Sequence, residues 1–174
     1  TLALTVKRPF LIPAILGAAF FLFICGYVQL NVVPFAMQSL GLSAEKGGYL
    51  FSATAVGIAI GARLSSRFSK EGPPIGLACL SGFFIACIFL LMGVFSHSLP
   101  LTIILLALLG VFGGLFLIPL ESFVQLSSPD KRRGQIIAAS NFLSFGSVLL
   151  SSFCIYLFNE VWGVSAIGGF LIIA

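Results

Sequence analysis

Residues 101–126 read LTIILLALLGVFGGLFLIPLESFVQL, an apolar run in which Glu121 is the only charged side chain. A helix needs about 20 apolar residues to cross a hydrocarbon core about 30 Å thick, so this run is long enough to span a membrane. The run is also continuous, whereas the strands of a membrane barrel alternate apolar and polar residues in segments of about ten. Because lipid offers the backbone no hydrogen-bond partners, the stretch predicts a transmembrane helix.

Four more apolar runs of spanning length surround this one, and the beginning of another follows the last of them. The four cover residues 9–38, 47–68, 75–95 and 135–158, and residues 159–162 lead into the incomplete one. With 59% hydrophobic and 8% charged residues, the chain has too little polar surface for a water-soluble globule of 174 residues. We therefore predict an all-α, polytopic membrane protein with five complete transmembrane helices and a truncated sixth.

The runs form a single unit. No polar linker or soluble segment interrupts them, so residues 1–174 are predicted to form one helical bundle. The sequence begins at Thr1 rather than at a Met, and it stops at Ala174 inside an apolar run. We expect it to be part of a longer protein.

The Lys and Arg residues predict which way the chain crosses the membrane. They gather before the first run, after the second, and between the fourth and fifth. Eight of the nine basic residues thus fall on one side, and only Lys46 falls on the other. Short loops rich in Lys and Arg stay in the cytoplasm, so the N-terminal end is predicted to be cytoplasmic. Such scattered charges suit an anionic membrane leaflet and not a nucleic acid, which requires a basic stripe with stacking aromatic residues.

The residue types needed for catalysis or metal binding are scarce. The four cysteines all lie inside apolar runs, none of them forms a C-x-x-C pair, and His97 is the only histidine. The nucleophile-elbow, phosphate-loop and zinc-helix motifs are absent from the sequence. The sequence therefore predicts no enzyme activity, no metal site and no cofactor in this chain.

Polar side chains inside the apolar runs are the candidates for function, because such residues are costly in a membrane. Glu121 lies near the cytoplasmic end of its run, and Gln125 follows one turn later on the same helix face. Glu121 has three interpretations: an ion pair with Arg132 or Arg133, a latch at a cytoplasmic gate, or a polar wall of a substrate path.

Gln29 and Asn31 lie in the outer part of the first run. Two residues correspond to about 200° of helix rotation, so the two side chains face nearly opposite ways. We expect Gln29 to point into a cavity and Asn31 to hydrogen-bond a neighbouring helix; contact with a neighbouring helix is the alternative for Gln29.

Glycines recur at helical spacing in two of the runs. Gly57 and Gly61 form a G-x-x-x-G pattern, and the fourth run holds Gly110, Gly113 and Gly114. Both groups are typical of helices whose backbones approach closely. The third run, in contrast, has no residue more polar than a serine, which predicts a lipid-facing position.

The fifth run carries a serine stripe at helical period, made of Ser140, Ser144, Ser147 and Ser151. Small hydroxyl residues of this kind form either a close-packing surface or a polar lining in membrane helices. Asn141 lies beside the stripe and is long enough to reach another helix.

Two stretches resemble a known family. They are residues 113–125, GGLFLIPLESFVQ, and residues 132–143, RRGQIIAASNFL. Together they look like the tenth helix, the following cytoplasmic loop and the eleventh helix of the bacterial lysophospholipid transporters, a family within the major facilitator superfamily. Members of that superfamily have twelve helices, so the resemblance implies that this chain is the C-terminal six-helix half.

The resemblance implies transport of a lysophospholipid, such as lysophosphatidylethanolamine, from the outer to the inner leaflet of a bacterial inner membrane for re-acylation. The implied partners are the substrate, the lipid bilayer, the N-terminal six-helix half and a cytoplasmic acyltransferase, to which this transporter is fused in several bacteria. Alternating access would come from rocking of the two halves, with the substrate between them near the midplane.

In that architecture the first and fourth helices line the central path. The candidate contacts along the path are Gln29, Glu121, Gln125 and Asn141, and the residues at the cytoplasmic gate or loops are Arg63, Arg67, Arg132 and Arg133. Arg63 and Arg67 resemble the basic loop between the eighth and ninth helices of the superfamily, without its usual acidic member.

Two other functions fit the sequence. An exporter of drugs or metabolites would share the fold, and a pair of proton-titrating carboxylates deep in the cavity would favour it. A non-transporting membrane anchor or assembly subunit would tolerate replacement of Gln29, Glu121 and the serine stripe by Ala or Leu without loss of function.

Overall fold

The computed structural model describes residues 10–68, 74–95 and 97–173, and in these residues the chain is helical without a strand. The helices are α2 (Leu11–Leu40), α3 (Ala44–Phe68), α4 (Ile75–Val94), α5 (Leu99–Ser127), α6 (Arg133–Tyr156) and α7 (Ala166–Ile173). A short 3-10 turn, Asp130–Arg132, precedes α6, and a π-helical turn, Leu157–Val161, follows it. Five of the elements are long and apolar enough to cross a membrane, which confirms the predicted all-α, polytopic fold.

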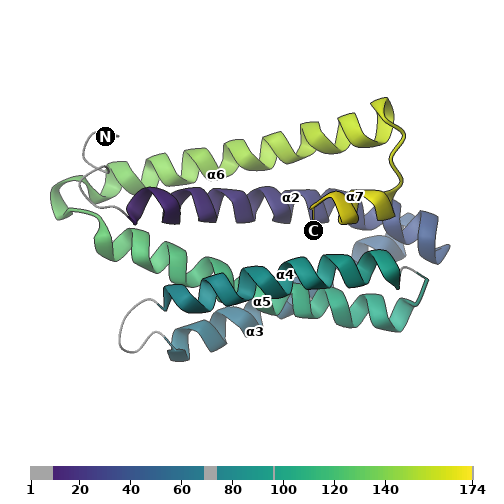
Figure 1. Ribbon diagram of the computed structural model, residues 1–174, viewed down its shortest axis with the longest axis horizontal. Coiled ribbons are helices and arrows are strands. Elements are labelled where there is room, and N and C mark those ends of the chain that lie inside the picture. Colours follow the sequence, from purple (N-terminus) through teal and green to yellow (C-terminus); the bar gives the residue numbers. More distant parts are fainter. Residues whose placement is uncertain (1–9, 69–73, 96, 174) are drawn as a thin grey trace.

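The long helices run up and down through one bundle (Figure 1). α3 packs most extensively on α5, α6 lies against α2, and α4 covers α5 from another side. The short α7 returns between α2 and α4 and contacts both (Figure 1). Short loops between successive helices produce this alternation, because a short connection places neighbouring helices antiparallel.

The boundaries differ from the predicted ones by a few residues. α3 begins at Ala44 rather than 47, because Glu45 in the first turn suits the positive end of the helix dipole. α5 begins at Leu99 rather than 101, because a proline is tolerated in a first turn. α6 spans Arg133–Tyr156 rather than 135–158, since the chain winds into a π turn from Leu157 onward.

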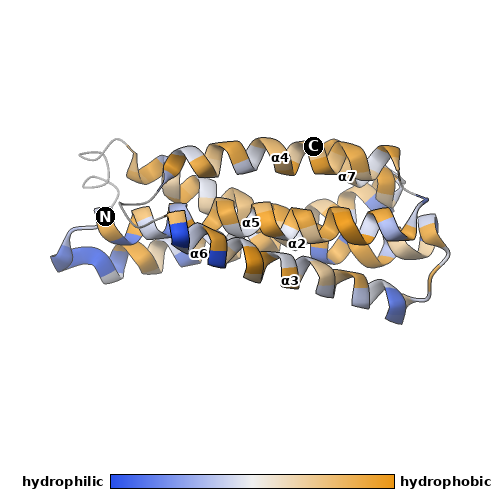
Figure 2. Cartoon of the chain, turned by 90° about the horizontal axis from the view of Figure 1, so that it is seen from below, coloured by the Kyte–Doolittle hydropathy of each residue, from blue (hydrophilic) through white to orange (hydrophobic). Residues whose placement is uncertain are grey.

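The basic residues lie where the charge pattern placed them. Arg63 and Arg67 are exposed in the last turns of α3, and Lys131, Arg132 and Arg133 are exposed between α5 and α6 at the same end of the bundle. Lys46 lies in the first turn of α3 at the opposite end. Hydrophilic residues accordingly gather mostly at the two ends of the bundle and apolar ones along its middle (Figure 2). Lys7, Arg8 and Lys70 lie outside the described residues.

Glycines bring α3 and α5 into backbone contact. A Cβ atom built at Gly61 would collide with the carbonyl of Val111, and one built at Gly114 would lie 2.6 Å from the backbone nitrogen of Ala62. Gly57 and Gly110 meet the facing backbone in the same way. The close approach predicted from the glycine spacing is therefore confirmed, and the two patterns pack against each other.

The serine stripe is the packing surface of α6 on α2. Ser144 and Ser151 are buried, and the Ser151 hydroxyl lies 2.5 Å from the position of a Cβ atom at Gly26. The Ser151 and Ser147 hydroxyls donate to backbone carbonyls of their own helix, at 2.7 Å and 3.0 Å. Ser144 and Ser151 therefore pack against α2, as the close-packing interpretation predicts, and Ser147 lies nearer the surface of the bundle.

α4 has one buried face and one exposed face. The face toward α5 and α7 buries residues Ala78, Ser81, Ile85, Phe89 and Met92. The Ser81 hydroxyl donates to the Leu77 carbonyl at 2.7 Å, so it places no unpaired polar group in the apolar interior. The outer face exposes Leu80, Phe83 and Leu90, which suits contact with lipid as the composition of this run predicts.

Candidate functional site

Apolar grooves cover one side of the bundle. One groove lies between α2 and α6 and is lined by Leu16, Ala19, Phe20, Phe23, Leu143, Ser147 and Leu150. A second runs beside α7, between α2, α4 and α5, and includes Phe20, Phe89 and Phe116. Ser147 is the only polar residue in the first groove, and its hydroxyl is bound within α6. Among the described residues, the walls of these two grooves therefore offer almost entirely apolar contacts.

Gln29 lies on the opposite side of α2. Nine residues separate it from Phe20, which is about two and a half helical turns, so the two side chains point away from each other. Gln29 is exposed, as is expected of a residue that faces an open path.

The Asn141 side chain projects from α6 on the side that also carries Gln29, which we call the open side of the bundle. It is exposed, and it lies about 200° around the helix from Leu143, which lines the groove. The structure thus places Gln29 and Asn141 on the side of the α2–α6 seam away from the apolar groove.

Glu121 and Gln125 are both exposed on α5. Glu121 lies about 140° around the helix from Phe116, so it too points away from the apolar grooves. The expected ion pair with Arg133 is not formed: the Arg133 guanidinium binds Asp130 at 2.8 Å, because that carboxylate is only three residues away. Within the described residues, no cation is bound to Glu121.

Glu121 and Asn141 lie at the same depth in the bundle. Leu120 packs on Gly17, with its Cδ1 3.2 Å from the position of a Cβ atom there, and so marks the level of Glu121 on α2. Gly26 packs on Val148 and Ser151 of α6. α2 and α6 run side by side in the same direction (Figure 1). Nine residues before Gly26 is Gly17, and the same step back along α6 leads to about Asn141, so Gly17 also marks the level of Asn141.

Gln29 lies nearer the opposite end of the bundle than Glu121 and Asn141 do. It is twelve residues from Gly17, or about 18 Å along the helix. The candidate path therefore has an inner polar level, with Glu121 and Asn141, and an outer one, with Gln29. Arg132 and Arg133 lie beyond the inner level, at the end of the bundle that carries the other basic residues, whereas the contact of Gly61 with Val111 places Arg63 several residues short of that level.

Asn31 joins α2 to α7, as its position opposite Gln29 predicted. It is fully buried, and its Nδ2 donates to the Ala166 carbonyl at 2.8 Å. Gln38 supports the same turn, because its Oε1 accepts from the Ala166 backbone N–H at 3.2 Å. Sequence reasoning missed Gln38, since nothing in the sequence indicates that α7 folds back onto the outer end of α2.

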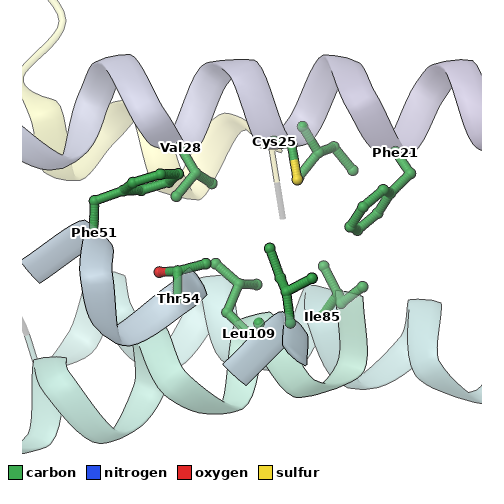
Figure 3. Close-up of a pocket in the computed structure, with 10 residues that line it drawn as sticks. Phe21, Cys25, Val28, Phe51, Thr54, Ile85 and Leu109 are labelled. Carbon is green, nitrogen blue, oxygen red and sulfur yellow. The ribbon is translucent and has the colours of Figure 1, made fainter. Parts of the chain in front are cut away.

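A small cavity of about 30 Å³ lies between α2, α3, α4 and α5. Figure 3 shows its walls, with Phe21, Cys25 and Val28 from α2 facing Thr54, Ile85 and Leu109. Thr54 is the one hydroxyl residue in the lining, and its buried oxygen has no hydrogen-bond partner among the described residues. Within the described part of the chain, no three His, Cys, Asp or Glu side chains are grouped to hold a metal ion.

The comparison with protein families identifies the architecture. The family model described as the Major Facilitator Superfamily matches residues 2–174. The chain belongs to the major facilitator superfamily. Its five long apolar helices and short α7 agree with half of a major facilitator fold, and the family makes it part of a multi-pass membrane transporter. No curated protein and no solved structure matches the chain.

Proposed function

We propose that this major facilitator chain belongs to a transporter that moves lysophospholipid across the inner membrane of a bacterium. The observation that carries the proposal is the open side of the bundle, where polar residues at two levels interrupt an otherwise apolar surface. Such a surface is complementary to an amphipathic substrate, because a headgroup requires polar contacts and an acyl chain requires apolar ones.

The apolar part of the path lies between the two polar levels. Leu22 is two turns from Gln29 on the same side of α2, and Leu117 is one turn from Glu121 on the same side of α5. Both side chains are partly exposed. An acyl chain that contacts these leucines would keep its apolar surface out of water while the headgroup remains at a polar level.

The two stretches that resemble the lysophospholipid transporters contain residues of the path. Residues 113–125 include Glu121 and Gln125, and residues 132–143 include Asn141. The resemblance and the open polar side therefore point to the same residues. This agreement favours a lysolipid over the unrelated solutes that other major facilitators export.

Transport would proceed by rocking of this bundle against an N-terminal half, with the substrate between them. The glycine contacts between α3 and α5 favour movement of these two helices as one rigid pair, because their backbones touch. Arg63, Arg67, Arg132 and Arg133 would lie at the cytoplasmic mouth, where anionic lipid attracts basic residues. A cytoplasmic acyltransferase would then re-acylate the lysolipid.

The test is uptake of labelled lysophosphatidylethanolamine by vesicles that contain the full-length transporter. Correct insertion is checked by the accessibility of a cysteine placed at Lys131, which should react only from the cytoplasmic side. Uptake that saturates with substrate concentration supports the proposal. A correctly inserted transporter that takes up no lysolipid would refute it and leave export of another solute as the function.

A further inference from the structure

Glu121 is a carboxylate in the membrane-spanning part of α5 that lacks an internal cation. It is exposed on α5, six residues before the helix ends at Ser127. The nearest basic candidates in sequence are Arg132 and Arg133, and Arg133 is bound to Asp130 at 2.8 Å. An ionisable residue within a spanning helix needs a partner, because charge is costly in a low-dielectric environment. No described residue supplies that partner.

The surroundings of Glu121 suit a bound ligand rather than a structural ion pair like that of Arg133 with Asp130. Asn141 lies at the same depth on α6, and both side chains are on the open side of the bundle, away from the apolar grooves. One turn toward the midplane, Leu117 presents a partly exposed apolar side chain. A carboxylate and an amide therefore lie at one depth on the same open face, and an apolar side chain lies one turn from the carboxylate.

We propose that Glu121 selects the headgroup of the substrate by binding a protonated amine, as carried by lysophosphatidylethanolamine. This inference rests on the proposed function and adds a headgroup preference to it. The carboxylate accepts charge-assisted hydrogen bonds from the ammonium group, and such bonds are stronger than those between neutral groups. Asn141 is placed to hydrogen-bond the phosphate or glycerol oxygens, since its amide can both donate and accept.

The preference follows from charge. An ethanolamine headgroup carries a cation that Glu121 attracts. A glycerol headgroup carries only the phosphate anion, which Glu121 repels. Removing the carboxylate should therefore weaken transport of the first headgroup and leave that of the second unchanged or slightly improved.

The experiment compares uptake of lysophosphatidylethanolamine and lysophosphatidylglycerol by vesicles containing the full-length transporter. The variants are Glu121→Gln, which removes the charge at nearly constant shape, and Glu121→Asp, which retains the charge on a shorter side chain. Glu160→Gln is the matched control, because Glu160 is exposed in the π turn at the other end of the bundle. We expect Glu121→Gln to lower ethanolamine-lysolipid uptake by about tenfold, as for the loss of a hydrogen bond to a charged group, with glycerol-lysolipid uptake unchanged. Glu121→Asp should retain part of the uptake and Glu160→Gln all of it.

Several results would overturn the inference while lysolipid transport itself stands. Equal losses of uptake for the two lysolipids in Glu121→Gln would mean that Glu121 stabilises the protein and does not distinguish between headgroups. An unchanged Glu121→Gln variant, or a parent that carries only the glycerol headgroup, would also overturn it. A folded parent that carries neither lysolipid is a different result, because it refutes the proposed function and the inference with it.

Discussion

The α3–α5 seam and the open side of α2, α5 and α6 are built from different kinds of residue. In the seam, four glycines allow two backbones to touch, and no side chain could be added without moving a helix. On the open side, Gln29, Glu121 and Asn141 are exposed, and no hydrogen bond or ion pair joins them to another described residue. The seam therefore determines whether the bundle folds, and the open side is free to serve a substrate.

The largest effect should come from filling the seam. Gly61→Val places a branched side chain against the Val111 carbonyl, so the helices must separate. We expect a loss of about 3 kcal/mol or more in the free energy of unfolding, at the upper end of overpacking effects. The yield of monodisperse protein in detergent, measured by size-exclusion chromatography, should fall sharply.

Gly146→Val is the matched control for that change. Gly146 also lies within a spanning helix, but a Cβ atom there meets nothing within 4 Å among the described residues. Equal yields for the two variants would show that the seam is no more sensitive than the exterior of α6.

A smaller effect should come from the buried amide that joins α2 to α7. Asn31→Leu removes the donor to the Ala166 carbonyl and with it the side-chain hydrogen bond between α2 and α7. We expect a destabilisation of about 1 kcal/mol, the net contribution of one hydrogen bond, read as a lower midpoint in thermal unfolding followed by intrinsic fluorescence.

Gln29→Ala, two residues away on the other side of α2, sharpens the contrast. Its stability should stay within about 0.5 kcal/mol of the parent, because Gln29 is exposed, while lysolipid uptake falls several-fold. If Gln29→Ala melted as early as Asn31→Leu, the division between supporting and functional residues on α2 would be wrong.

The smallest effect should come from the serine stripe. Ser147→Ala removes a hydroxyl that bonds only to its own helix, so stability should change by about 0.5 kcal/mol or less and uptake should not change. A marked loss of uptake with normal folding would return the stripe to the substrate path.

Some features could be predicted without coordinates because a single physical constraint governs them. Backbone groups in lipid must be satisfied within a helix, so the apolar runs alone predict the five spanning elements. The positions of Lys46 and of the described arginines at opposite ends follow from the same runs and the distribution of charge. Asn31 was correctly predicted to bond another helix, since it lies about 200° from Gln29 around α2.

Other features depended on which helices become neighbours. The serine stripe was open to two interpretations because its spacing is the same on a packing face and on a lining face. The contact of Ser151 with Gly26 and the burial of Ser144 support packing for those two serines. An ion pair with Arg132 or Arg133 was one of three interpretations of Glu121, and the described residues do not form it; Arg133 binds Asp130, one turn away, instead.

The sequence by itself determined the class of fold, the number and length of the long helices and the side on which most charges lie. These depend on apolar length and charge, which are properties of single segments. Only the tertiary structure decided that the glycines of α3 meet those of α5, that α7 returns to Asn31, and that Glu121 and Asn141 share one depth. Those are relations between segments far apart in the chain, and they follow from the packing of side chains that no single run contains.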